Sequence, residues 1–338
     1  MRNTMKFAAI GLDHRHIYDL TQGLLEAGLE CAGYWPETTA PIVLEGFRKR
    51  FPGMPAVDKR ALLDDPSIAI FAVAAVPCDR AALAIEAMRH GKDVLCDKPG
   101  VTTLDQLAEV ERAARETGRI FSVCFGRFLS PALEVAMDIA RQGGIGRLVQ
   151  MAGLAPHRLN RALRPGWFFE RKKFGGILND LACHHIDSFV ALTGAAEVEI
   201  VHSAVGQFGT APDFDDFGEI VLRSAAATAY VRVDWFTPDG LPTWGDGRLF
   251  LLGTEGTVEL RKNLDIEGRP GTDHVFVADK HGTRHIDAGG RTVNSFRAFA
   301  QDVMRRPPTN LPQRQVFDVC RLALQAQARA TRMVAKPA

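Results

Sequence analysis

The sequence predicts an N-terminal α/β domain with a doubly wound parallel sheet, followed by an α+β domain with an open, mostly antiparallel sheet. Up to about residue 125, short apolar runs alternate with segments of helical spacing, as in parallel strands covered by helices on both faces. Later runs rich in Val, Leu and aromatic residues follow one another with few helices between them, which is typical of antiparallel strands. The 338 residues also suit two domains of roughly 150 residues each.

We place the domain boundary at 125/126, so that the domains are 1–125 and 126–338, and the last helices could pack back on the first domain. The first domain is expected to hold five strands and at least two helices. One predicted helix has Thr102 or Thr103 as its N-cap and Gly118 as its stop. The strand-like runs are 5–10, 29–34, 68–75, 93–96 and 120–124, and the helical segments are 81–88 and 104–115.

The second domain is expected to begin with a helix over 131–144 and to continue mainly as strands. Gly-containing turns such as Gly253-Thr254-Glu255-Gly256 separate some of these strands. The predicted strands are 147–154, 198–207, 217–223, 227–236, 248–253 and 256–260, with helices over 177–193, 292–304 and 314–334.

Composition excludes several classes of function. Lys and Arg number 41 against 40 Asp and Glu, and no basic block stands out, so neither nucleic acid nor an anionic membrane is an expected partner. The longest apolar run, Ile68 to Val76, is far shorter than the ~20 residues that cross a bilayer as a helix. The six cysteines form no CxxC motif, and we expect a reduced, cytoplasmic protein without a signal peptide.

The stretch IGLDHRHIYDL, residues 10 to 20, joins the first strand to the first helix. A loop in this place usually binds phosphate through glycines, but here only Gly11 is kept. Three interpretations stay open. The loop could be an altered dinucleotide site, a metal site formed by Asp13, His14 and His16, or a polar turn in which Asp13 caps the helix. An ionised Asp13 that faced a pyrophosphate would repel it.

Two further clusters of polar residues could carry chemistry. Asp97-Lys98-Pro99 follows the fourth strand, where the Lys98 ammonium could stabilise negative charge on a substrate oxygen; a solvated turn lysine is the bland alternative. In GGILNDLACHHID, 100° per residue places Asp180, His184 and Asp187 on one helix face and turns His185 away. An Asp–His pair is a plausible general base, although the same stripe could be only a polar helix face. Zinc is less favoured, because no third His or Cys ligand lies nearby.

Together these pieces resemble the Gfo/Idh/MocA oxidoreductase family over nearly the whole chain. The specific ones are VAAVPCDRAALAIEAMRHGKDVLCDKPG and GGILNDLACHHID; AAIGLDHRH, FGRFLSP and RLFLLGTEGTVEL add to them. The resemblance implies an N-terminal Rossmann domain that binds NAD, with NADP as the alternative, and a C-terminal sheet used for oligomerisation. It also implies a sugar, cyclitol or glycoside as substrate and a homodimer or homotetramer.

The resemblance also assigns roles to residues. Lys98, Asp180 and His184 would be catalytic, with Asp180 and His184 as the acid/base pair and Lys98 beside the reacting carbon. Arg127, Trp167 and Asp187 are candidate substrate residues. The cofactor-binding candidates are Gly11, Asp13, His14, His16, Glu37, Pro77, Asp97 and Lys98, with Glu37 on a ribose hydroxyl. No basic residue stands beside Glu37 to meet a 2′-phosphate, which favours NAD.

Other functions remain open on the sequence. A relative that recycles its NAD, such as a hydride-shuttle glycosidase or an epimerase-like enzyme, would hold its cofactor tightly and release no net NADH. A non-catalytic nucleotide-binding regulator fits the altered loop, but it has no need of Lys98, Asp180 and His184. A metal hydrolase using the first loop would contain stoichiometric metal.

Overall fold

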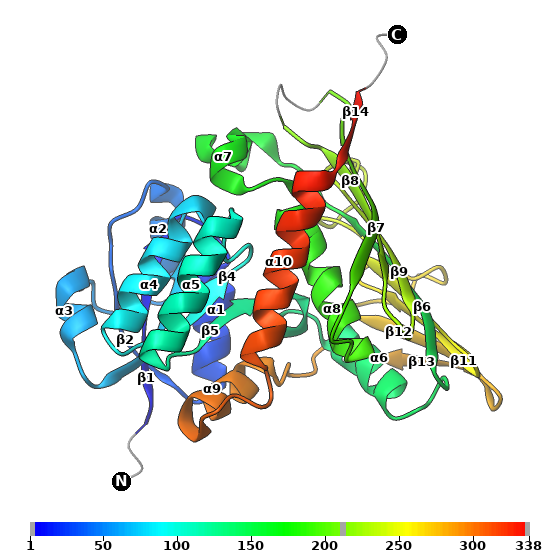
Figure 1. Ribbon diagram of the computed structural model, residues 1–338, viewed down its shortest axis with the longest axis horizontal. Helices are drawn as coiled ribbons and strands as arrows, with labels where there is room; N and C mark the ends of the chain where they lie inside the picture. Colours follow the sequence, from blue (N-terminus) through cyan, green and yellow to red (C-terminus); the bar gives the residue numbers. More distant parts are fainter. Residues whose placement is uncertain (1–3, 210–213, 335–338) are drawn as a thin grey trace. The chain divides into compact units, whose positions relative to one another are not determined.

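The structure is a computed structural model that describes residues 4–209 and 214–334 (Figure 1). The contacts within the chain divide it into two units. The first consists of the residues up to Phe128 together with Lys172–Gly175 and Asn294–Arg321. The second consists of Leu129–Arg171, Gly176–Val293 and the residues from Leu322 onward. No helix in the described part of the chain is both long enough and apolar enough to span a membrane.

The first unit contains a five-stranded parallel sheet in the order β2-β1-β3-β4-β5, which confirms the expected Rossmann architecture. Every residue of β4 and β5 is buried, which agrees with their mainly apolar central residues. The strands are β1 (Lys6–Leu12), β2 (Glu30–Tyr34), β3 (Ile68–Ala74), β4 (Asp93–Asp97) and β5 (Phe121–Cys124).

Helices cover this sheet. The Thr103 side chain caps α5 by accepting a hydrogen bond from the Gln106 N–H, and Gly118 ends the helix at φ +64°, as the sequence predicts. Helices α4 and α5 lie side by side, and α1 packs against α9 (Figure 1). The α-helices are α1 (Ile17–Glu26), α2 (Pro41–Arg50), α3 (Lys59–Asp64), α4 (Arg80–Arg89), α5 (Leu104–Thr117), α7 (Arg171–Phe174), α9 (Ser295–Arg305) and α10 (Gln313–Arg329), and two 3₁₀-helices are η1 (Pro77–Asp79) and η2 (Gly126–Phe128). Arg171 of α7 and the part of α10 from Leu322 onward belong to the second unit.

The second unit contains a nine-stranded sheet in the order β13-β12-β11-β10-β6-β9-β8-β7-β14. The pairs β6/β9 and β14/β7 are parallel and the other neighbours are antiparallel, so the expected mostly antiparallel sheet is confirmed. The strands are β6 (Leu148–Pro156), β7 (Glu199–Gln207), β8 (Phe217–Arg223), β9 (Thr228–Asp234), β10 (Arg248–Gly253), β11 (Gly256–Arg261), β12 (His274–Asp279), β13 (Gly282–Asp287) and β14 (Thr331–Val334).

Three of these strands differ from the sequence prediction. The predicted helix 314–334 is wrong at its end, because α10 stops at Arg329 and Thr331–Val334 pairs with β7. Strands β12 and β13 were not predicted. All residues of β13 are exposed or half-exposed, so it lacks the apolar alternation of a half-buried strand. β12 is held by pairing with β11, and β13 is held by pairing with β12.

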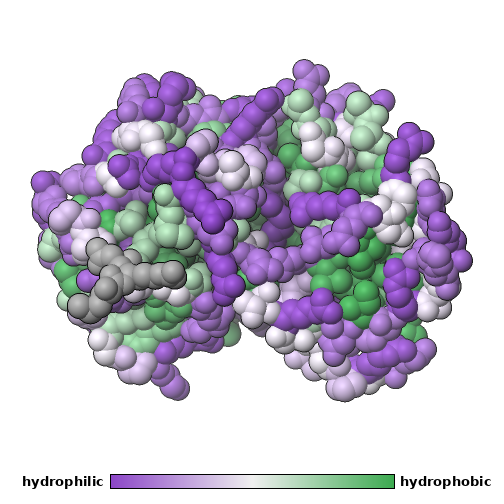
Figure 2. All heavy atoms as spheres, turned by 90° about the horizontal axis from the view of Figure 1, so that it is seen from below, coloured by the Kyte–Doolittle hydropathy of each residue, from purple (hydrophilic) through white to green (hydrophobic). Residues whose placement is uncertain are grey.

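One face of this sheet is covered by helices of the same unit. Helix α6 packs on β11 and β12, α8 packs on β6, and the π-helix η5 packs on β8 and β9. The opposite face exposes Val149, Val201, Phe250 and Leu252. The helical elements are α6 (Pro131–Arg141), η3 (Arg161–Leu163), η4 (Gly166–Phe169), η5 (Leu178–Ala182) and α8 (Cys183–Thr193). On the molecular face in Figure 2, hydrophobic residues form separate patches between hydrophilic ones.

A glycine is required at position 11, because β1 passes close to Ala75, the residue that follows β3. The φ of Gly11 is +65°, and a Cβ there would lie 2.6 Å from the Ala75 Cβ and 2.9 Å from the Ala75 Cα. Gly118 has nearly the same φ, +64°, with nothing within 4 Å of the corresponding position. The two glycines therefore share the backbone conformation but only Gly11 is enclosed.

We predict that Gly11→Ala lowers the free energy of unfolding by more than Gly118→Ala. Both changes carry the cost of a positive φ, roughly 1–2 kcal/mol, and Gly11→Ala adds an overpacking cost of about 1–3 kcal/mol. Thermal and urea denaturation of the two variants measure the difference. Equal losses of unfolding free energy in the two variants would contradict this prediction, because they would mean that Ala75 moves away without a cost in free energy.

Candidate functional site

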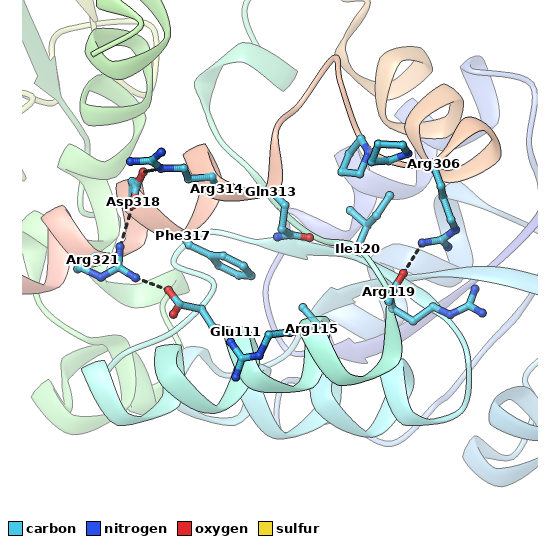
Figure 3. A pocket seen from close by; sticks show the side chains of 14 residues that line it. Glu111, Arg115, Arg119, Ile120, Arg306, Gln313, Arg314, Phe317, Asp318 and Arg321 are labelled. Carbon is cyan, nitrogen blue, oxygen red and sulfur yellow. Dashed lines mark hydrogen bonds and ion pairs between the residues drawn. The ribbon is translucent and has the colours of Figure 1, made fainter. Parts of the chain in front are cut away.

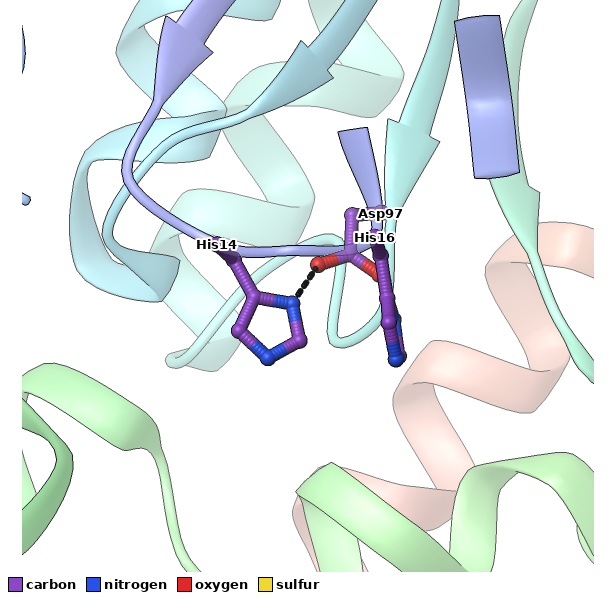
Figure 4. Close-up of side chains that lie close together, drawn as sticks. All are labelled: His14, His16 and Asp97. Carbon is purple, nitrogen blue, oxygen red and sulfur yellow. Dashed lines mark hydrogen bonds and ion pairs between the residues drawn. The ribbon is translucent and has the colours of Figure 1, made fainter. Parts of the chain in front are cut away.

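Asp97, the last residue of β4, is fully buried and gathers three side chains of the first unit (Figure 4). Its Oδ2 lies 2.7 Å from Arg80 Nη2 and 2.8 Å from His14 Nδ1, and its Oδ1 lies 2.8 Å from His16 Nδ1. Burial alone would raise the pKa of Asp97, but Arg80, His16 and His14 outweigh burial and hold the pKa well below its usual value. The carboxylate is therefore ionised at neutral pH.

Arg80 also holds the backbone that carries Lys98. Its Nη1 donates to the carbonyl oxygens of Asp97, Lys98 and Pro99 at 3.1, 2.5 and 3.0 Å, and its Nε donates to the Ala75 carbonyl at 2.8 Å. Arg80 is only 1% exposed. One buried guanidinium thus joins the end of β3 to the turn after β4, at the carboxyl edge of the sheet where ligands of this fold bind.

The structure groups different residues from the metal site that the sequence suggested: the cluster is His14, His16 and Asp97. One ligating atom from each of these residues lies within 4.8 Å of the others. Asp13 is not a member, so the set Asp13, His14 and His16 is wrong. The new set also fits a metal poorly, because Arg80 already bonds the carboxylate and brings a positive charge where a cation would sit.

Asp13 instead anchors the segment that follows β2. Its Oδ1 accepts hydrogen bonds from Thr38 Oγ1 (2.9 Å), Thr39 N (2.6 Å) and Thr39 Oγ1 (2.7 Å). The N-cap of α1 is His16, which makes no side-chain cap bond, so the expected capping by Asp13 is wrong. Three donors now surround the carboxylate oxygen that was expected to repel a pyrophosphate.

The remaining cofactor candidates of the first unit lie along the same sheet edge. Gly11 is the last residue but one of β1, Glu37 is exposed beyond β2, and Pro77 begins η1 after β3. The Lys59 ammonium lies 5.2 Å from the centre of the Trp35 ring and 2.9 Å from Glu86 Oε2. Sequence analysis missed this basic residue near the end of β2, because it comes from α3, much later in the chain.

In the second unit, the predicted helix 177–193 is two elements. Asp180 lies in the π-helix η5, whereas His184 and Asp187 lie in the α-helix α8. A π-turn advances by less than 100° per residue, so the helical wheel does not apply across Asp180, although residues four apart still face a similar way. Single π-turns are frequent at functional sites.

His185 points to the sheet. A Cβ at Gly153 of β6 would lie 2.1 Å from the His185 Cδ2, so the ring packs on this glycine. Burial lowers the pKa of His185 to about 4, and its Nδ1 has no hydrogen-bond partner in the described chain. His185 therefore stays neutral against the sheet at neutral pH, which leaves the neighbouring His184 as the candidate base.

The substrate candidates lie in different units. Arg127 is in η2 of the first unit, where its carbonyl accepts a hydrogen bond from Ser295 Oγ at 2.9 Å. Trp167 is buried in η4 of the second unit, and Asp187 is fully buried in α8. Arg164, which sequence analysis missed, stacks 4.5 Å from the centre of Phe168 and 5.1 Å from the centre of Trp235.

A large cavity of the first unit, about 840 Å³, lies away from these residues (Figure 3). It is lined by α5, Ile120 and the first turns of α10, and Ile120 precedes β5, so this is the amino edge of the sheet. Several of its arginines are ion-paired: Arg321 contacts Glu111 and Asp318, and Arg314 contacts Asp318. We therefore place the candidate site at the carboxyl edge.

Comparison with known families identifies both parts of the chain. Residues 42–125 match an oxidoreductase family with an NAD-binding Rossmann fold, and residues 134–259 match the GFO/IDH/MocA C-terminal domain. The chain is 38% identical to a candidate oxidoreductase from Erwinia carotovora atroseptica over 98% of this chain and 100% of that one, with a TM-score of 0.90.

Two further comparisons concern levoglucosan dehydrogenase. The chain is 29% identical to the enzyme of Pseudarthrobacter phenanthrenivorans over 67% of this chain and 56% of that protein. A solved levoglucosan dehydrogenase with NADH and levoglucosan has a TM-score of 0.78 over 97% of both chains, and at 19% identity this likeness concerns the fold. The chain spans between about a third and two thirds of the length of the curated relatives it matches.

We predict that Arg80→Met destabilises the protein by about 3–5 kcal/mol at pH 7, because it leaves a buried carboxylate without its guanidinium. Burial would then raise the pKa of Asp97 in the variant, so the variant regains stability as the pH falls through this raised pKa. In the wild type the pKa of Asp97 is lowered, so its contribution to stability is lost only below the unfolded pKa of about 3.9. The thermal midpoint of Arg80→Met should therefore lie less far below that of the wild type at pH 5 than at pH 7.

The matched control is Arg119→Met. Arg119 lies 3.9 Å from Asp93, which keeps its closer partner Arg306, and its side chain is 36% exposed. We expect a loss below about 1 kcal/mol. A similar loss in both variants, or one that is independent of pH for Arg80→Met, would contradict the assigned role of the Arg80–Asp97 pair.

Proposed function

The chain belongs to the Gfo/Idh/MocA family of oxidoreductases, and from this membership we propose that it is an NAD(P)-dependent dehydrogenase acting on a CH–OH group. The substrate proposed is a sugar, cyclitol or glycoside, as the names of levoglucosan dehydrogenase and its substrate complex suggest. The observation that carries the proposal is the turn after β4, where Arg80 holds the backbone of Lys98 at the ligand edge of the Rossmann sheet.

The residues of the first unit suit a dinucleotide. The chain passes closely over Ala75 at Gly11, an exposed acidic residue, Glu37, follows β2, and the imidazoles of His14 and His16 lie in the loop before α1. We propose Gly11, His14, His16, Glu37, Pro77 and Lys98 as cofactor contacts, with Asp13 and Asp97 positioning the loop. When bound, the nicotinamide would accept or donate the hydride.

We propose NAD as the cofactor. Glu37 could accept hydrogen bonds from the ribose hydroxyls of NAD and would repel a 2′-phosphate. The nearby Lys59 is already paired with Glu86 at 2.9 Å, which reduces its attraction for a phosphate. NADP remains the alternative, since Lys59 is the one basic side chain seen against Trp35 in the described chain.

The proposed chemistry divides among three residues. His184 takes the proton of the substrate hydroxyl as the carbinol carbon is oxidised, and the Asp180 carboxylate stabilises the imidazolium that forms. The Lys98 ammonium stabilises the negative charge that develops on the oxygen. Arg127, Trp167 and Asp187 are the proposed substrate-binding residues.

The proposal extends to assembly and location. The uncovered sheet face with Phe250 and Leu252 is the proposed surface of a homodimer or homotetramer. None of the cysteines in the described part of the chain forms a disulfide, which agrees with the proposed cytoplasmic location. An NAD-recycling enzyme is the second candidate, and it differs by releasing no net NADH.

We predict that His184→Ala lowers kcat by roughly two to four orders of magnitude while NAD affinity and the thermal midpoint change little, because general acid/base catalysis contributes that much. NADH formation should be followed with levoglucosan, inositols and glucosides. His202→Ala is the control, since His202 is exposed on β7 and its Nε2 lies 3.3 Å from Glu219 Oε1.

Turnover near wild type in His184→Ala would remove His184 from the base role. NAD binding without NADH formation from any polyol would favour the recycling enzyme or a regulator. Product formation from a glycoside with constant NADH would identify the recycling enzyme.

A further inference from the structure

The cavity at the amino edge of the first sheet carries an excess of positive charge (Figure 3). Among the described residues that line it, five are arginines and two are acids. The arginines are Arg115, Arg119, Arg306, Arg314 and Arg321, and the acids are Glu111 and Asp318. The volume of about 840 Å³ is in the range of small-molecule sites, roughly 300–1,000 Å³. A cavity of this size and charge attracts a small anion.

Two of these arginines are committed to the fold. Arg306 donates to the buried Asp93 and to the carbonyl oxygen of Gly118, the latter at 2.8 Å. Arg321 pairs with both of the acids that line the cavity. These two guanidinium groups hold the wall of the cavity, and their charges are already balanced by carboxylates.

The other three arginines have donors to spare. Arg115 is exposed, and its side chain makes no hydrogen bond or ion pair with any described residue. Arg119 lies 3.9 Å from Asp93, and Arg314 lies 3.4 Å from Asp318. In Figure 3 Arg314 extends from α10 above the cavity, whereas Arg115 extends from α5 below it. Like charges around one cavity repel one another, and an anion between them relieves this repulsion.

An aromatic side chain forms a flat wall of the same cavity. The ring of Phe317 is half-buried and lies nearly parallel to the ring of Phe121, with 6.3 Å between the ring centres and an interplanar angle of 13°. Ile120, Pro307 and Pro308 add apolar surface to the lining. A planar apolar group can pack on such a wall, and a guanidinium can stack on the same ligand ring.

Hydrogen bonds hold this wall in place without a ligand. The Gln313 Oε1 accepts a hydrogen bond from the Phe121 N–H at 2.9 Å, and the Gln313 Nε2 donates to the Phe121 carbonyl at 2.5 Å. The amide thereby pairs with β5 at the edge of the sheet, as a further strand would. Gln313 precedes Phe317 by four residues on α10, so the pair also fixes this ring. A preformed wall lowers the entropic cost of binding.

We propose that this cavity binds a planar organic anion, an aromatic ring that carries carboxylate, sulfonate or phosphate groups. The acidic groups pair with Arg115, Arg119 and Arg314. The ring packs on Phe317. This site is separate from the proposed dinucleotide site, because the turn that carries Lys98 follows β4 at the carboxyl edge of the sheet. The inference therefore does not depend on the proposed function.

The test is isothermal titration of the full chain with naphthalene-1,5-disulfonate, a planar aromatic dianion. We expect Arg115→Gln, Arg119→Gln and Arg314→Gln each to weaken binding about two- to fivefold, the value of an exposed ion pair, and the triple variant to weaken it at least about tenfold. Thermal midpoints should stay unchanged. Arg112→Gln is the matched control, since Arg112 is exposed on α5 three residues before Arg115 and does not line the cavity.

Two further titrations locate the charge and the site. The neutral analogue 1,5-dihydroxynaphthalene should bind more weakly, with the same affinity in the wild type and in the triple variant. Saturating NAD should leave the affinity for the disulfonate unchanged, and added salt should lower it.

Four outcomes would overturn the inference: no binding of the disulfonate to the wild type, wild-type affinity in the triple variant, an equal loss in Arg112→Gln and Arg115→Gln, or displacement of the disulfonate by NAD. Failure of NAD itself to bind would count against the proposed function alone, because the arginine variants test this site without NAD.

Discussion

The buried ion pair between Asp97 and Arg80 is the constraint on which the candidate site of the first unit depends. Burying a carboxylate away from solvent costs free energy unless it is paired and hydrogen-bonded, and here three side chains contact the Asp97 oxygens. The guanidinium neutralises the charge and the two imidazoles complete the shell. The same guanidinium bonds three carbonyl oxygens of the following turn, so the conformation of Lys98 is tied to the ionisation of Asp97.

This constraint also explains the departure of the loop 11–16 from a glycine-rich pattern. Gly11 is retained because the backbone passes within contact of Ala75, where no side chain fits. His14 and His16 are side chains long enough to reach across β3 to Asp97 at the end of β4. Asp13 faces the other way and ties the loop to Thr38 and Thr39. The loop is thus anchored on one side to the segment after β2 and on the other side to the end of β4.

In the second unit, the elements that carry Asp180 and His184 are held by the sheet. The π-turn η5 packs on β8 and β9, and α8 packs on β6 through His185 and Gly153. Because Gly153 has no side chain, the ring of His185 reaches the sheet and the helix is held close to it. Both adjacent histidines are half-buried, and the ring of His185 lies against Gly153 of the sheet.

Local pattern in the sequence determined the five parallel strands, most of the antiparallel strands, the Thr103 cap and the Gly118 stop, because each depends on neighbouring residues or on burial of a whole apolar run. It also directed attention to Gly11, His14, His16, Lys98 and His184. Only the tertiary structure decided that Asp97 and not Asp13 joins the two loop histidines, that Arg80 holds the turn at Lys98, and that Thr331–Val334 forms β14 beside β7. Those decisions depend on contacts between residues far apart in the chain, and the spacing of residues along one segment carries no information about them.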